Sequence, residues 1–131
     1  MAALDRAFAR QLIDASVATT AITAVTSPIK CRLYTSSGTA AAAGTEVSGG
    51  SYVSQTVAFA AATNVDPPVA SSTTSPLSFT SMPACTVVAV GLYDSAGTPR
   101  RLWFGDLAAS KVLNSGDTFQ IAAGSLTCSL A

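Results

Sequence analysis

The spacing of apolar residues divides the chain into two unequal parts. Near the N-terminus, apolar side chains recur every three or four positions, which is the period of a helix with one apolar stripe. This pattern predicts a helix over residues 3–18. The positions of its stripe are Leu4, Phe8, Leu12 and Ala15.

After Pro28 the apolar period changes to two, as expected for half-buried strands. About seven strands are predicted, and no long helical pattern separates them, which disfavours a parallel α/β sheet. Turn signals every 8–12 residues are typical of an antiparallel β-sandwich or barrel-like fold. We therefore expect a mainly β single domain over 1–131, with a helical segment at 1–20 and the sandwich at 28–131. The expected strands are 29–35, 53–62, 77–80, 86–94, 100–104, 107–113 and 118–130, the last with a corner at Gly124.

Two segments have the composition of loops, 36–52 and 63–76, because they are rich in Ser, Gly, Ala, Thr and Pro. Gly91 lies inside the strongest predicted strand. It indicates a bulge or a close backbone approach.

The predicted helix is too short to be stable alone, so its stripe must be covered. Two partners are open, the core of the same subunit and a neighbouring subunit. Docking on its own core is the favoured interpretation.

Composition adds a reason to expect neighbours. Only 11% of the 131 residues are charged, less than half of the roughly 25% usual in globular domains. A surface so poor in Lys and Glu is cheap to bury against another subunit. The net charge is zero and the longest basic run is Arg100–Arg101, which disfavours nucleic-acid binding, because phosphate neutralisation needs clustered basic residues.

Cysteine and histidine usage restricts metal and redox chemistry. The chain has three cysteines (Cys31, Cys85 and Cys128) and no histidine, which removes the usual structural zinc sites. Free thiols in a reduced compartment are expected, although one disulfide with a spare thiol is left open. No convincing signal peptide and no apolar run of about 20 residues occurs. We expect synthesis in the host cytoplasm and no membrane contact.

The residues do not indicate an enzyme. Without histidine, the usual general base near neutral pH and the Ser-His-Asp arrangement are missing. A hydrolase using two carboxylates, such as Asp94 and Asp106, is the remaining catalytic hypothesis. Turn positions explain Asp94 and Asp117 more simply, because Asp hydrogen-bonds its own backbone there. We expect no cofactor and no metal, with a calcium site built from several loops left open.

Three stretches together resemble a known family. They are TEVSGGSYVSQTVAFAAA (45–62), TVVAVGLYDSAGTPRRLWFGDL (86–107) and VLNSGDTFQIAAGSLTCSL (112–130). Their order and spacing are similar to those of small proteins of tailed bacteriophages, usually labelled tail-fibre-like or minor capsid proteins. Ser54 departs from the pattern, since an arginine is common there. The matching positions are Glu46, Gly49, Gly50, Tyr52, Val57, Phe59, Gly91, Leu92, Tyr93, Asp94, Val112, Gly116, Asp117, Thr118, Ile121, Gly124 and Leu126.

The resemblance implies a structural role in the virion without enzymatic activity. A fibre shaft usually shows repeats or heptads, and neither occurs here. The favoured expectation is therefore a decoration (cement) protein that binds the major capsid protein and other virion proteins on the head surface, self-associated as a homotrimer. The alternatives are a head or tail fibre subunit, or a receptor- or carbohydrate-binding module with Trp103 and the tyrosines in one cleft.

Eight residues are the candidates for contact with a partner. Three lie on the helical stripe, two in the EVSGGSY segment and three at the start of the predicted return strand. The EVSGGSY segment equally suits a plain corner between strands. The candidates are Leu4, Phe8, Leu12, Glu46, Tyr52, Arg100, Arg101 and Trp103.

Overall fold

The computed structural model describes residues 3–62 and 69–130. Across these residues the fold is mainly β, with antiparallel sheets and one short N-terminal helix, as predicted, and with nine strands instead of seven. The elements are β1 (Ala3–Leu4), α1 (Arg6–Val17), β2 (Ile29–Tyr34), β3 (Gln55–Val57), β4 (Val69–Ser72), β5 (Leu77–Met82), β6 (Cys85–Tyr93), β7 (Arg101–Leu113), β8 (Asp117–Ile121) and β9 (Thr127–Leu130).

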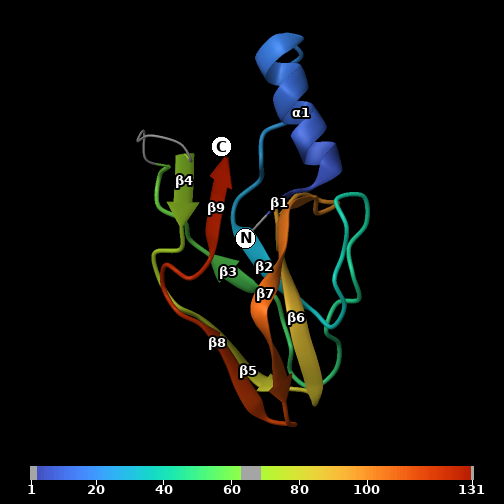
Figure 1. The fold of residues 1–131 in the computed structure, drawn as a ribbon, viewed down its shortest axis with the longest axis vertical. Helices are drawn as coiled ribbons and strands as arrows, with labels where there is room; N and C mark the ends of the chain where they lie inside the picture. Colours follow the sequence, from blue (N-terminus) through green and yellow to red (C-terminus); the bar gives the residue numbers. More distant parts are fainter. Residues whose placement is uncertain (1–2, 63–68, 131) are drawn as a thin grey trace.

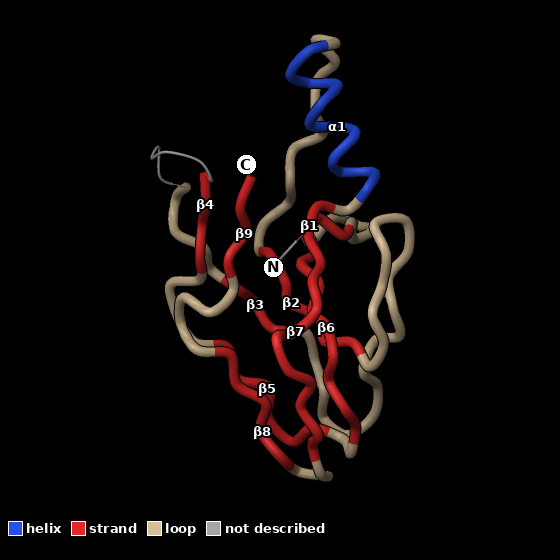
Figure 2. Tube along the Cα trace, viewed as in Figure 1, coloured by secondary structure: helices blue, strands red, loops and turns tan. Residues whose placement is uncertain are grey.

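The strands form three antiparallel sheets (Figures 1 and 2). The largest has the order β1-β7-β6-β2-β3, and β4–β9 and β5–β8 form two-stranded sheets beside it. The β6–β7 hairpin is the centre of the large sheet. Its register pairs Leu92 with Trp103 on one side, while Leu92 pairs with Cys31 of β2 on the other.

The core fills the space between the large sheet and the β5–β8 pair. Because side chains alternate between the two faces of a strand, Cys31 and Leu33 of β2 point into it from the large sheet. Phe79 of β5 is 1% exposed and packs against Phe119 of β8, with ring centroids 6.1 Å apart.

The opposite face of the large sheet carries a smaller aromatic cluster. Tyr34 and Tyr93 are both buried there, and their hydroxyl groups hydrogen-bond each other. The guanidinium of Arg32 lies 4.1 Å from the centre of the Tyr93 ring. A Cβ at Gly91 would lie 2.9 Å from the Tyr34 ring, so a side chain approaches Gly91 closely, and not the backbone that was predicted.

Several strand boundaries differ from the sequence prediction. The loop predicted over 63–76 contains β4, with residues 63–68 outside the described part. Strand 53–62 is reduced to β3, because the chain beyond it pairs with another segment: the N–H of Ala60 donates to Ser72 O and that of Thr74 to Ala58 O. The two short strands predicted at 100–104 and 107–113 are the continuous β7, which follows β6 with register shifts.

Helix α1 does not dock on the core. None of its side chains is buried. Figure 1 shows it projecting from one end of the three sheets, which we together call the β body. After α1 the chain reverses, with Thr19 at a φ of 54°, and returns beside the helix as an extended segment over 20–26 (Figure 2). We call residues 6–27 the arm. The favoured prediction of core docking was wrong, because a helical period fixes which face is apolar and not what covers that face.

The three cysteines are free thiols, as predicted. Burial raises the pKa of the Cys31 thiol to about 12 and that of the Cys128 thiol to about 11. Among the described residues, no helix has the length and apolar character to cross a membrane.

Candidate interaction site

The paired arginines before and at the start of β7 point in different directions and both hold the arm. Arg100 reaches the extended segment of the arm, while Arg101 reaches the residue that begins its helix. Of the predicted candidates, these two are placed at one junction, between the β body and the arm.

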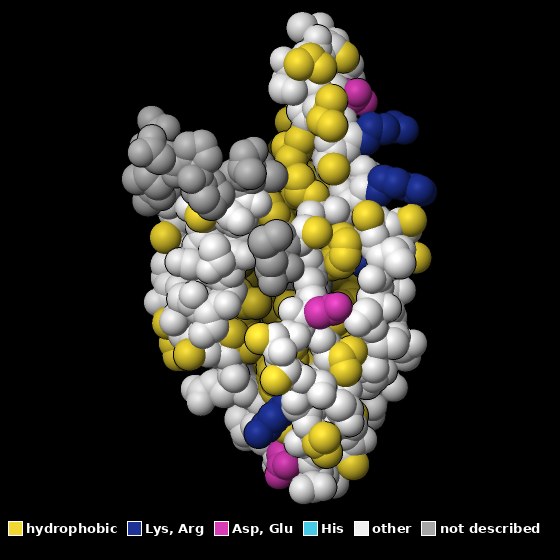
Figure 3. Space-filling model, in the orientation of Figure 1, with side chains coloured by type: hydrophobic (Ala, Val, Ile, Leu, Met, Phe, Trp, Pro, Cys, Tyr) yellow, Lys and Arg dark blue, Asp and Glu magenta, His cyan; other side chains and the backbone are white. Residues whose placement is uncertain are grey.

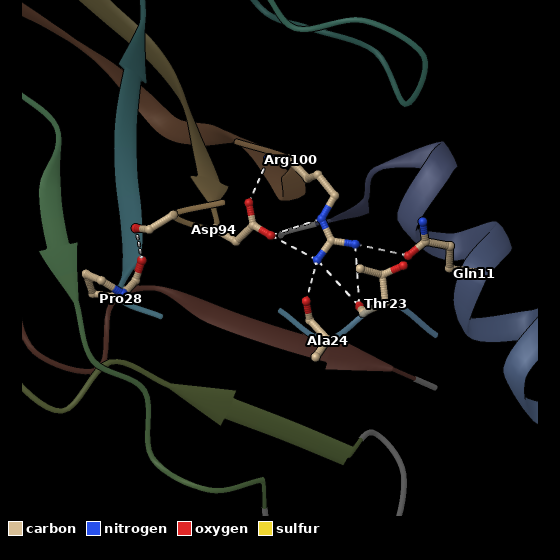
Figure 4. Close-up of polar contacts among 7 residues, drawn as sticks. Gln11, Thr23, Ala24, Pro28, Asp94 and Arg100 are labelled. Atoms are coloured by element: carbon tan, nitrogen blue, oxygen red, sulfur yellow. Dashed lines mark hydrogen bonds and ion pairs between the residues drawn. The ribbon is translucent and has the colours of Figure 1, made fainter. Parts of the chain in front are cut away.

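Arg100 is fixed by Asp94, which directly follows β6 (Figure 4). One Asp94 carboxylate oxygen accepts the Arg100 backbone N–H at 2.8 Å, and the other accepts Nε at 2.9 Å. The guanidinium then donates to Ala24 O at 3.0 Å and, from Nη1, to the Gln11 side chain at 3.2 Å. The turn role predicted for Asp94 is confirmed, and the same carboxylate also orients the arginine toward the arm.

The charge of Asp94 is stabilised although the residue is only 1% exposed. Burial alone disfavours the ionised form, but the hydrogen bonds from the Arg100 backbone and guanidinium outweigh it and hold the pKa of Asp94 below its usual range. Because Asp94 and Arg100 are joined by charged hydrogen bonds, the Arg100 guanidinium is held in one orientation, toward the arm.

Arg101 makes the second junction. Its Nη2 lies 2.8 Å from the carboxylate of Asp5, which is also the N-cap of α1 and accepts the Ala7 N–H at 2.9 Å. The guanidinium also donates to Thr39 O and lies 4.5 Å from the centre of the Phe104 ring. Asp5 was missed as a site residue, although a polar residue directly before an apolar helical period is a recognisable capping signal.

Glu46 and Tyr52 serve the loop between β2 and β3. The Tyr52 hydroxyl donates to Glu46 at 2.9 Å and accepts the Leu33 N–H at 3.0 Å, while its ring stacks near Phe79 with centroids 6.2 Å apart. These contacts fit the corner between strands that the sequence left open. They leave both residues half-buried.

Trp103 lies in a different place, an apolar groove between β7 and the segment leading into β9. The groove is lined by residues from β6, β7 and the last strand, and a hollow with hydrophobic atoms is visible there in Figure 3. We call it the β7–β9 groove. Its lining residues include Val90, Leu92, Trp103, Leu107, Leu126 and Cys128.

The helical stripe is only partly covered. Leu4 lies in β1, paired with Trp103, and not in the helix predicted from residue 3. Leu4, Phe8 and Leu12 are half-buried. The most exposed apolar side chains of the arm are others that the stripe did not include. They are Ile13 (61% exposed), Val17 (77%), Ile22 (37%) and Val25 (39%).

Asp94 and Asp106, the two carboxylates of the hydrolase hypothesis, do not lie together. Asp94 forms an ion pair with Arg100. Asp106 lies opposite Ala89 of β6, and Ala89 is five positions before Asp94 in the chain. At strand spacing this separates the two aspartates by about 16 Å. Within 3–62 and 69–130, no three His, Cys, Asp or Glu side chains gather as a metal site. Tyr34 and Tyr93 do not share a cleft with Trp103, since they are buried on the opposite face of the sheet.

Comparison with known families identifies the class of protein. Residues 3–129 match the family described as podophage GP4 fiber I protein gp80. The chain belongs to this family, which makes it a structural protein of a tailed-phage virion. No curated protein and no solved structure matched the chain.

Proposed function

We propose that the protein is a small fibre subunit of a podophage particle, attached to the virion through protein–protein contacts. The observation that carries this proposal is the family match, which spans nearly the whole chain and is described as a fibre protein. The fold is compatible with the role, because a rigid β body with two surfaces for partners suits a subunit of an assembly.

The junction of body and arm supports an attachment role. Arg100 and Arg101 fix the arm at its helix start and along its return segment. The arm therefore projects in a defined direction, with apolar residues exposed on it. A projecting element held by charged hydrogen bonds is pre-organised, which lowers the entropic cost of binding.

Decoration of the capsid is the second candidate, with the major capsid protein as the partner. The low content of charged residues favours it, since many weak contacts on a repeated lattice add as avidity. Both roles place the protein in the virion, on the tail in the first case and on the head surface in the second.

The two roles differ in copy number and position. In purified particles of the phage that encodes the protein, we expect quantitative mass spectrometry to find far fewer copies than of the major capsid protein. Antibody labelling in electron micrographs should lie at the tail region. A near-equal ratio with labelling over the whole head would replace the fibre proposal with decoration, and absence from purified particles would end both.

A further inference from the structure

The arm ends in a segment that has the character of a strand without having a strand partner. Residues 20–26 are extended, exposed and rich in Thr, Val and Ile, which are residues with high β propensity. In the described part of the chain, no backbone N–H between residues 21 and 26 donates a hydrogen bond. No charged residue occurs from Ala15 to Ile29, so this segment is cheap to remove from water.

The β7–β9 groove is bordered partly by strand edges that lack a partner. β9 pairs with β4 on one side only. The outer edge of β7 is paired with β1 at Trp103 and Phe104 and is open from Gly105 onward, as far as the described residues show. An open edge beside an apolar groove is a template for an added strand. Half-buried Trp103 and Leu126 line the floor of this groove.

The arm of a chain does not fill the groove of that chain. The groove is lined by β6, β7 and the segment 125–128, with no residue of the arm among its described lining. Arg100 and Arg101 hold the arm at the turn end of the β6–β7 hairpin, next to Leu92 and Trp103 of the groove. As far as the described residues show, the groove is thus unfilled by the arm of its own chain.

From these two unpartnered surfaces we infer that the arm of one copy binds in the β7–β9 groove of a second copy of this chain. The extended segment 20–26 lies along the groove, with Ile22 and Val25 against its apolar floor. Seven extended residues reach about 23 Å, whereas the four residues of β9 need about 13 Å. The arm is thus long enough to follow the whole open edge of β9.

Charge supports a second copy as the occupant. Arg6 is exposed on α1 and makes no ion pair with a described residue, whereas Arg10 pairs with Asp14 on the same helix. In Figure 3 basic side chains project from one side of the arm while hydrophobic atoms lie on the other. Asp106 is the charged residue in the lining of the groove, is exposed, and makes no ion pair with a described residue. Arg6 on the arm and Asp106 at the rim of the groove thus carry opposite charges that are unpaired within the described chain.

This contact joins two different surfaces, so it is heterologous and closes into a ring when the rotation between copies allows it. It deepens the proposed fibre role by naming one partner. The homotrimer expected from sequence is one such ring. Since the test uses the purified protein, its failure would leave the virion role untouched.

The first test is the mass of the protein in solution, by light scattering after size-exclusion chromatography. We expect the wild type at two or more times the 13.1 kDa of one chain, and Ile22→Asp/Val25→Asp as a monomer. The arm itself is kept in this variant, because Arg100 binds backbone carbonyl groups there and not the substituted side chains. Thr98→Asp, in the exposed turn before β7, is the matched control and should retain the wild-type mass. A monomeric wild type, or an unchanged mass in the double variant, would overturn the inference.

The second test locates the contact by disulfide formation. In a Cys85→Ser/Cys128→Ser background, Ile22→Cys is combined with Ala108→Cys, because Ala108 is exposed and lines the groove. Oxidation should give covalent dimers and larger species on a non-reducing gel, while either cysteine alone, or Ile22→Cys with Thr98→Cys, should remain monomeric. Dimers from Ile22→Cys alone would mean that arms bind arms, and a cross-linked monomer would mean that the arm reaches its own groove; either result rejects the proposal.

Discussion

The β body and the arm follow the same amphipathic rule and end in opposite situations. In the body, the apolar face of each strand meets another sheet, and Phe79, Leu33 and Met82 are almost fully buried. In the arm, the apolar stripe is only half covered by its own chain, and apolar residues outside the stripe are exposed, such as Val17 at 77%. Apolar periodicity thus predicts which face of an element is apolar. Whether that face is buried by the same chain depends on the tertiary fold.

The difference predicts where stability resides, and the largest effect is expected in the body. Phe79→Ala should lower the free energy of unfolding by about 3–5 kcal/mol, because it opens a cavity among Phe119, Tyr52 and their neighbours. Urea unfolding followed by tryptophan fluorescence measures this. Val17→Ala on the arm is the control and should change it by less than about 0.5 kcal/mol. Equal losses in both variants would contradict the division into a stabilising body and a non-stabilising arm.

The junction between the two regions should give the next largest effect. Arg100→Met leaves the Asp94 carboxylate, with a side chain 0% exposed, without its cation. Loss of one partner of a buried pair costs about 3–5 kcal/mol, and the partial exposure of Arg100 reduces this to about 2–3 kcal/mol. The measurement is again urea unfolding.

A second readout separates the arm from the body in this variant. Hydrogen exchange should rise in residues 6–27, because the carbonyl groups of Thr23 and Ala24 lose their donor. Arg32→Met is the matched control, since Arg32 also pairs with a carboxylate, but that carboxylate belongs to Glu46 of the β2–β3 loop and not to the arm junction. A similar rise in arm exchange in both variants would show that Arg100 has no special role there.

The aromatic face of the large sheet should respond to a single methyl group. In Gly91→Ala the new Cβ would lie 2.9 Å from the Tyr34 ring and 3.2 Å from the Tyr93 ring, and overpacking of this kind costs about 1–3 kcal/mol. Gly97→Ala is the matched control, because nothing lies within 4 Å of its added Cβ. Thermal unfolding compares the two, and an equal melting temperature would mean that the tyrosine pair moves freely away.

Acid should weaken the junction. The pKa of Asp94 is lower in the folded protein than in the unfolded chain, where it is about 3.9. The contribution of the Asp94 carboxylate to stability is therefore fully present above that value and is lost as the pH falls through the folded pKa. Unfolding free energies measured from about pH 6 to about pH 2 should fall more steeply for the wild type than for Asp94→Asn. Parallel curves would show that Asp94 is not stabilised as an anion.

The sequence predicted those parts of the molecule that depend on local pattern. The β6–β7 hairpin, its turn at Asp94 and the N-terminal helix follow from periodicity and turn chemistry among neighbouring residues. The turn at Asp117 is also as predicted, because its carboxylate accepts the Asn114 N–H at 2.8 Å.

What the sequence did not predict depends on contacts between distant segments. β4 exists because its four residues pair with β9 near the C-terminus, and no local pattern in 63–76 indicates this. The join of Arg100 to Ala24 spans 76 positions. Arg100 and Arg101 were candidates for contact with a neighbour, but their partners on their own chain, Asp94 and Asp5, became visible only in the fold.

The smallest effect is expected on the charged side of the arm. Arg10 and Asp14 form an i, i+4 pair at 3.8 Å, but the Arg10 side chain is 82% exposed, so solvent screens the attraction. Arg10→Ala should change the free energy of unfolding by no more than about 0.5 kcal/mol when measured on dilute monomer. A loss above about 1 kcal/mol would mean that the arm contributes to the stability of its own chain, and would remove the contrast between arm and body. An unchanged stability would show that the charged side of the arm does not stabilise its own chain and is free to contact other molecules.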